Sequence, residues 1–151
     1  MKYHLLENEN LNSVKRKNGK YGWYYPRRRG SIQGIVIHSA EGNPAKNVAQ
    51  YLTVNTEPAS AHVVIDESTI VPLLPDECVA FHLSGYNSKS LALGVAYWSH
   101  KWGENLQLED LMLINIAKWC KQKAELYNLP ISRVNKSNWA RGQKVLYMLM
   151  I

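Results

Sequence analysis

The run Gly34-Ile-Val-Ile-His38-Ser-Ala-Glu-Gly42, with a strand predicted over residues 32–38, constrains the fold more than any other part of the sequence. Its β-branched residues favour an extended strand, and their unbroken apolar character is typical of a strand buried within a sheet. A histidine at the carboxyl end of such a strand lies where sheet proteins present side chains to a ligand or a metal. His38 is therefore a candidate zinc ligand. A catalytic zinc needs about three protein ligands, so His38 alone is not sufficient.

The segments after His38 alternate between strand-like and helical patterns. They predict a helix over Ala45–Val54, strands over 60–66, 69–74 and 91–98, a long helix over Leu106–Tyr127 and a short helix over 135–144. Only Glu67-Ser68 separates the first two of these strands, which predicts an antiparallel hairpin. The mixture predicts an α/β fold with a single mixed central sheet flanked by helices.

Length and composition limit the class of protein. A chain of 151 residues with 46% hydrophobic residues fits one domain with one core. No apolar stretch reaches the roughly 20 residues of a membrane span, and the amino terminus has no apolar signal-peptide centre. We therefore expect cytoplasmic synthesis. Cys78 and Cys120 lack the number and spacing of a disulfide framework and are expected to be buried thiols.

Much of the positive charge lies in residues 1–30, which are expected to form an extended lead-in to a domain over 31–151. The formal net charge of +6 favours an anionic partner. Basic residues here alternate with tyrosine and tryptophan, a mixture that can bind a nucleic acid or an anionic cell-wall polymer. The plainer interpretation, which we favour, is a solvated arm that wraps onto the domain. Nucleic-acid binding is the weakest of these alternatives.

Four segments carry a family resemblance when they are taken in order. They are Ile35-Val-Ile-His38-Ser, Ser60-Ala-His62-Val-Val-Ile-Asp66, the stretch from Val71-Pro-Leu-Leu-Pro-Asp76 to Val79-Ala-Phe-His82, and Asn87-Ser-Lys-Ser-Leu. In this order and spacing they resemble the zinc-dependent N-acetylmuramoyl-L-alanine amidases of the peptidoglycan-recognition and phage-endolysin group. The resemblance covers roughly residues 31–144.

The resemblance implies a reaction and a set of site residues. In the family, zinc held by two histidines and a cysteine or aspartate activates a water that cleaves the amide between N-acetylmuramate and L-alanine of peptidoglycan. His38 is implied as the first zinc ligand, and His62, His82 and Asn87 are implied as substrate-groove residues. Strand alternation independently predicts that His62 points away from the main core.

Two positions depart from the family pattern. The family glutamate that assists the zinc-bound water aligns with Ala96, so no catalytic residue is intact, and loss of a general base costs about 10²- to 10⁴-fold in rate. After Lys144 the family continues into a strand with a Gly-His pair and a loop with the third ligand, whereas this chain has Val145-Leu-Tyr-Met-Leu-Met-Ile151. The missing ligand segment leads to the hypothesis of a truncated or frameshifted reading frame.

Three functional interpretations follow. The leading one is a peptidoglycan amidase of phage or bacterial origin that acts at the cell wall after release and is impaired in this form. The alternative is a non-catalytic peptidoglycan-binding module that uses His62, His82 and Asn87. A less favoured possibility is a rebuilt metal site in which His38, His62 and His82 converge with Asp66 or Glu41.

Overall fold

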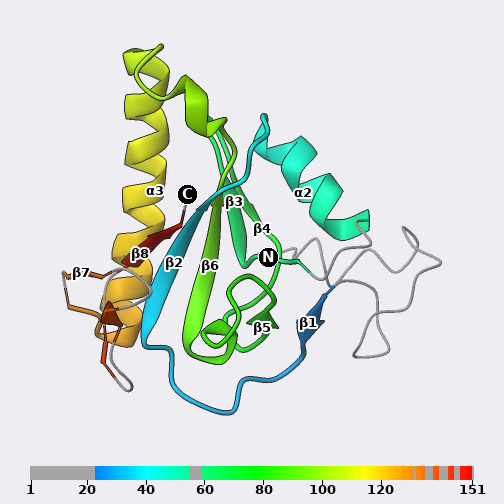
Figure 1. The fold of residues 1–151 in the computed structure, drawn as a ribbon, viewed down its shortest axis with the longest axis vertical. Helices are drawn as coiled ribbons and strands as arrows, with labels where there is room; N and C mark the ends of the chain where they lie inside the picture. Colours follow the sequence, from blue (N-terminus) through cyan, green and yellow to red (C-terminus); the bar gives the residue numbers. More distant parts are fainter. Residues whose placement is uncertain are drawn as a thin grey trace.

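The computed structural model describes residues 23–54, 59–130, 132–134, 138–139, 143–144 and 147–150. Six strands form one sheet in the order β4-β3-β6-β2-β8-β7 (Figure 1). Their bounds are β2 Gly34–Ser39, β3 Val63–Ile65, β4 Ile70–Pro72, β6 Ser90–Val95, β7 Arg133–Val134 and β8 Tyr147–Met150. Only β4 runs antiparallel to its neighbour, and the other pairs are parallel. The predicted α/β class with a mixed sheet is confirmed.

Strand alternation divides the sheet into two packed faces. On β2 and β6, Ile35, Ile37, Leu91 and Leu93 belong to a core with Met112, Ile116 and Trp119 of the long helix α3 (Leu106–Tyr127). Alternate residues of the strands, such as Val64 and Ala92, point to the other face and pack with Ala45 and Ala49 of helix α2 (Ala45–Val54). The two helices therefore cover opposite faces of the sheet, as Figure 1 shows.

Both long helices begin and end where the sequence predicts. The Asn105 side chain accepts a hydrogen bond from the Leu108 amide at the start of α3, and Asn128 ends the helix in the left-handed conformation with φ 53°. Not every apolar side chain at helical spacing is buried. Tyr51 is 59% exposed and Leu126 is 63% exposed, although both fit the apolar spacing. Small residues at Ala45 and Ala49 contact the sheet in α2 instead.

The hairpin and the central strand match their predictions, with shorter bounds. β3 and β4 pair antiparallel through Val63–Pro72 and Ile65–Ile70. β6 lies between β3 and β2, and all six of its residues are buried. Cys78 and Cys120 are both buried, as predicted, and neither forms a disulfide. The predicted helix over 135–144 lies mostly outside the described residues.

The described end of the lead-in packs against the domain. Strand β1 (Tyr24–Tyr25) pairs antiparallel with β5 (Val79–Ala80) in a separate two-stranded sheet, seen at the lower right of Figure 1. Tyr24 is only 2% exposed and joins the α2 side of the core. The carboxyl segment also joins the fold, because β8 pairs with β2. Among the described residues, no helix is long and apolar enough to cross a membrane.

Candidate functional site

His38 lies at the carboxyl end of β2, near the middle of the sheet. Its register partners are Gly94 on β6 and Met150 on β8. Ile35 and Ile37 belong to the core beside α3, so His38 points to the opposite face, and its ring is half-buried there. This is the position that the sequence predicts for a ligand-binding histidine. The backbone register also places position 150 beside it.

His82 reaches the same place from the loop that follows β5. Its Nδ1 lies 2.9 Å from Nε2 of His38, and the two rings meet edge to face with centroids 5.1 Å apart. The Asn87 side-chain oxygen accepts hydrogen bonds from the amides of His82 and Leu83, at 2.9 and 2.8 Å. The structure therefore brings together three of the four predicted site residues, namely His38, His82 and Asn87.

The surroundings of the histidine pair are poorly solvated. Burial lowers the pKa of His38 to about 4 and lowers the pKa of His82 well below its usual value. A positive charge on either ring would further disfavour a charge on the other. Both imidazoles are therefore neutral at pH 7. A neutral imidazole retains one lone pair, which is the form that binds a metal.

His62 lies apart from this pair. It faces away from the core beside α3, as strand alternation predicts, but it is enclosed within the fold. It is 2% exposed and sits between β3 and the loop before β5. Its Nδ1 accepts a hydrogen bond from the Ala92 amide at 2.9 Å, so the hydrogen of the neutral ring lies on Nε2. Nε2 then donates to the Cys78 carbonyl oxygen at 2.9 Å. The ring leaves the core beside α3, as alternation requires, but the loop before β5 covers it.

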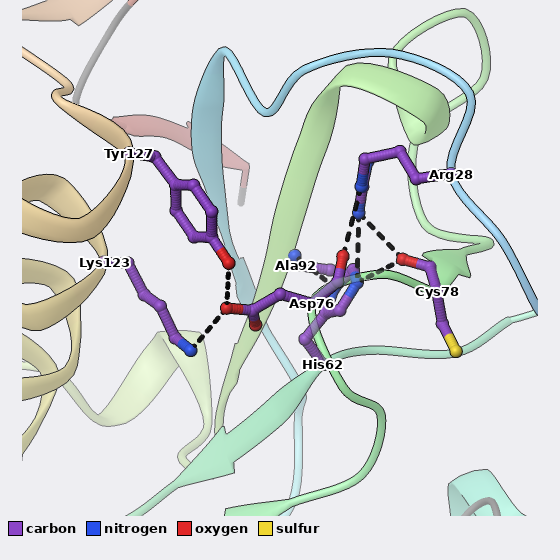
Figure 2. A network of polar contacts seen from close by, with 7 residues as sticks. All are labelled: Arg28, His62, Asp76, Cys78, Ala92, Lys123 and Tyr127. Carbon is purple, nitrogen blue, oxygen red and sulfur yellow. Dashed lines mark hydrogen bonds and ion pairs between the residues drawn. The ribbon is translucent and has the colours of Figure 1, made fainter.

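Arg28 fixes this loop in place (Figure 2). Its guanidinium donates to the backbone oxygens of Asp76, Cys78 and Ser88 at 3.1, 2.8 and 2.8 Å. Nη2 also contacts Nε2 of His62 at 3.3 Å, but both nitrogens carry hydrogen and this contact is not a hydrogen bond. Arg28 therefore joins the lead-in, the loop before β5 and the segment that contains Asn87. Its neighbours Arg27 and Arg29 are exposed.

The same network continues to α3. Asp76 forms an ion pair with Lys123 at 2.7 Å, and its Oδ2 accepts a hydrogen bond from the Tyr127 hydroxyl at 2.5 Å. Figure 2 shows both contacts reaching from α3 toward the loop that holds Cys78. The pKa of Tyr127 is raised, mainly by burial and then by the hydrogen bond to Asp76. The loop is thus fixed from both sides, by Arg28 and by α3.

The acidic residues proposed for a rebuilt metal site are engaged elsewhere. Asp66 accepts hydrogen bonds from the amides of Ala45 and Thr69, at 2.7 Å each, and so fixes the start of α2 to the β3–β4 turn. Glu41 accepts from the Ser39 hydroxyl at 2.6 Å and from the Ser99 amide at 3.0 Å. Within the described residues, no group of three His, Cys, Asp or Glu side chains could hold a metal ion. The described residues therefore do not fit a three-ligand zinc site.

Ala96 occupies a structural position in this chain. It is fully buried in the core beside α2, just beyond the end of β6. Its amide donates to the Ile65 carbonyl and its own carbonyl accepts from Asn43, at 2.8 and 2.9 Å. The methyl group of Ala96 therefore fills space in the apolar core, while its backbone forms hydrogen bonds with Ile65 and Asn43.

Sequence reasoning missed two residues of the site, Arg28 and Ser90. Arg28 lies in the triplet Arg27-Arg28-Arg29, and nothing in the sequence distinguishes the one arginine that points inward. Ser90 precedes the apolar run of β6 and is 0% exposed, with its hydroxyl 3.0 Å from Nε2 of His82. The available signal was a serine at the start of a strand that is otherwise apolar, since a hydroxyl buried there requires a partner.

Comparison with solved structures finds the same fold in several proteins. The chain superposes on PlyL at 19% identity with TM-score 0.62, covering 91% of this chain and 80% of PlyL. It superposes on the Staphylococcus aureus hydrolase AmiA at 15% identity with TM-score 0.67, covering 95% and 68%. It superposes on the PlyG catalytic domain at 20% identity with TM-score 0.61, covering 91% of this chain and 78% of that domain.

Sequence comparison gives the family. A search of curated proteins found no match. A family model described as N-acetylmuramoyl-L-alanine amidase matches residues 28–145, which include every strand from β2 to β7 and both long helices. The matched region also contains His38, His82 and Asn87. The chain therefore belongs to the N-acetylmuramoyl-L-alanine amidase family.

Proposed function

We propose that the chain acts on peptidoglycan at the cell wall, at the amide between N-acetylmuramate and L-alanine, and that hydrolysis is impaired in this 151-residue form. The observation that carries the proposal is His38, at the end of a central parallel strand in a fold of this family, with His82 and Asn87 beside it. We further propose His38 as a zinc ligand.

The impaired rate rests on two features of the chain. The position aligned with the family glutamate is Ala96, and losing a general base lowers the rate by about 10²- to 10⁴-fold. Zinc also requires donors beyond those that the described residues bring near His38. The substrate contacts that we propose are His82 and Asn87. His62 has both ring nitrogens engaged within the fold and is better placed to support the loop than to meet substrate.

The alternative function is a non-catalytic peptidoglycan-binding module, which the same observations favour if hydrolysis is absent. His82 and Asn87 are half-buried, and the His82 amide donates to the Asn87 side-chain oxygen at 2.9 Å. Nucleic-acid binding has weaker support, since Arg28 of the basic triplet is committed to backbone carbonyls. Such binding would weaken steeply with salt.

The test measures cleavage and binding separately on the purified chain. Muropeptides are incubated with the protein and Zn²⁺, and the release of stem peptides is followed by chromatography. We expect saturable muropeptide binding with slow or undetectable release. Rapid release at the rate of a complete amidase would contradict the impairment, while absence of both binding and release would contradict the peptidoglycan function.

Metal content gives a second, independent measurement. We expect less than one zinc per chain in the purified protein. The variant Met150→His is expected to increase zinc uptake, because position 150 pairs with His38 in the sheet register. Met148→His is the matched control, since it lies on the same strand but pairs with Val36. Equal zinc uptake by the two variants would contradict the proposed role of His38.

A further inference from the structure

Four polar groups form a continuous row from the loop before β6 to His38. The Ser90 hydroxyl lies 2.6 Å from the Tyr86 carbonyl oxygen and 3.0 Å from Nε2 of His82. Nδ1 of His82 lies 2.9 Å from Nε2 of His38. Every distance is that of a hydrogen bond, so each hydrogen in the row must point in a definite direction.

The direction follows from the carbonyl at one end. A carbonyl oxygen only accepts, so the single hydrogen of Ser90 points to Tyr86. The Ser90 oxygen is then free only to accept from His82, and this places the His82 hydrogen on Nε2. In a neutral imidazole with its hydrogen on Nε2, Nδ1 has a lone pair, so Nδ1 of His82 accepts from Nε2 of His38. Nδ1 of His38 therefore carries the remaining lone pair.

We propose that Ser90 and His82 are positioning residues, which hold His38 in the tautomer with hydrogen on Nε2 and so make Nδ1 the nitrogen that meets a ligand. The ligand class is a metal cation or a group that donates a hydrogen bond. The assignment of zinc as that cation rests on the proposed function, whereas the tautomer does not. Among the described residues, Nδ1 of His38 has no hydrogen-bond partner that would compete with a ligand.

The fold holds the row rigidly. Ser90 begins β6 and is paired with Gly34 at the start of β2, so its position relative to His38 is set by the sheet. His82 is held through its amide by the Asn87 side chain. Arg28 in turn fixes the carbonyl of Ser88 in the segment that contains Asn87. The three members therefore belong to one packed unit, and a hydrogen bond fixes both the tautomer and the ring orientation of a ligating histidine in this way.

The test reads the tautomer of His38 directly, in the metal-free 151-residue chain. Two-bond ¹H–¹⁵N correlation spectra distinguish a nitrogen that bears hydrogen from one with a lone pair. We expect hydrogen on Nε2 and a lone pair on Nδ1 of His38, with at least about tenfold preference, the factor that one hydrogen bond of about 1.4 kcal/mol supplies. The opposite tautomer in the wild-type chain would overturn the proposal.

Variants test whether the two positioning residues are responsible. His82→Asn keeps an acceptor oxygen near the place of Nδ1, so it is expected to preserve the His38 tautomer, whereas His82→Ala is expected to give a mixture. Ser90→Ala is expected to produce the same mixture, because His82 can then turn its hydrogen toward His38. Ser68→Ala is the matched control, since its hydroxyl contacts Asp66, away from this row. An unchanged tautomer in Ser90→Ala would refute the role of Ser90, even if His82→Ala does not fold.

Zn²⁺ alone serves as the probe of the open nitrogen. We expect titration with Zn²⁺ to shift the Nδ1 resonance of His38 and to leave the hydrogen on Nε2. A shift of Nε2 with loss of its hydrogen would contradict the proposal. If Zn²⁺ causes no shift while the tautomer is as expected, the positioning role stands and the zinc assignment of the proposed function fails.

Discussion

His62 and the pair His38–His82 occupy the same side of the sheet, yet their rings are held in different ways. His62 is enclosed, with one nitrogen on the Ala92 amide and the other on the Cys78 carbonyl. His38 is half-buried, and one of its nitrogens contacts His82 while the other has no partner among the described residues. All three imidazoles have lowered pKa values because of burial. A lowered pKa therefore does not by itself separate a structural histidine from a ligand-binding one.

The two kinds of histidine differ in how many of their ring nitrogens already have hydrogen-bond partners. A ring whose two nitrogens are both engaged by backbone groups stabilises the fold and has nothing left for a ligand. When one ring nitrogen is held by a hydrogen bond and the other has no partner, the ring is oriented and can still bind a ligand. The comparison predicts that His62 contributes mainly to stability and His38 mainly to binding.

The largest effect is expected from removing the enclosed ring. His62→Ala leaves a cavity and an unpaired Ala92 amide, and we expect a loss of about 4 kcal/mol in the free energy of unfolding. Urea denaturation followed by circular dichroism measures it. His62→Asn is the control, because its side-chain oxygen can still accept from the amide, and it should lose less. A loss below about 1 kcal/mol for His62→Ala would contradict the prediction that His62 contributes mainly to stability.

The pH dependence of stability is the next largest effect. Burial lowers the pKa of His62 to about 4, against 6.5 for the ordinary group, so the unfolded chain takes up the proton first as the pH falls. We expect His62 to lower the free energy of unfolding by about 3 kcal/mol between pH 6.5 and pH 4. This contribution is fully present above pH 6.5. Arg28, Asp76 and Lys123 are the charged groups that act on this ring.

Denaturation curves at several pH values check this dependence against His62→Asn, which cannot titrate. The difference between the two proteins should shrink as the pH falls from 6.5 to 4, because only the wild-type chain loses the His62 contribution. A constant difference would show that His62 is not buried in its neutral form.

Arg28 should contribute less than His62 and more than its neighbours. Arg28→Ala leaves the carbonyls of Asp76, Cys78 and Ser88 without their charged donor, and we expect a loss of about 2 kcal/mol in unfolding free energy. Arg27→Ala is the matched control and should change stability by less than about 0.5 kcal/mol, because Arg27 is exposed. Similar losses for the two variants would mean that Arg28 does not hold the loop. Thermal unfolding distinguishes them.

The smallest effect on stability is expected from His38. His38→Ala removes one hydrogen bond from a half-buried ring, and we expect a loss of about 1 kcal/mol. The same variant should abolish Zn²⁺-induced shifts in the nuclear magnetic resonance spectrum. A loss as large as that of His62→Ala would place His38 among the structural residues and would contradict its proposed role.

The sequence predicted the elements well because their signals are local. The run Ile35–Ile37 and the bounds of α3 follow from β-branched character, helical period and end residues, and all of these act over a few positions. His38 could be identified as a candidate ligand because its place at the end of a strand is visible in the sequence of that strand alone. His82 was singled out only through the family resemblance, and its direct contact with His38 was not predicted, since 44 residues separate the two rings.

Burial of His62 and the role of Arg28 were beyond sequence reasoning for the same physical reason. Alternation correctly places His62 on the face opposite α3, but whether that face meets solvent depends on a loop folded over it. That loop is held by Arg28 and, through its own Asp76, by Lys123 and Tyr127 of α3. Arg28, Lys123 and Tyr127 are all distant from the loop in the sequence. Tertiary contacts, rather than local pattern, decided the environment of the ring.

The contacts of Arg28 also have a kinetic consequence. Its hydrogen bonds to Cys78 and Ser88 close loops of 50 and 60 residues, so their formation needs most of the intervening chain to be in place. We therefore expect them to be absent from the transition state for folding. Arg28→Ala should then accelerate unfolding while leaving the refolding rate nearly unchanged. In the native protein, the arginine that holds the loop beside the histidines would set how long the assembled site persists.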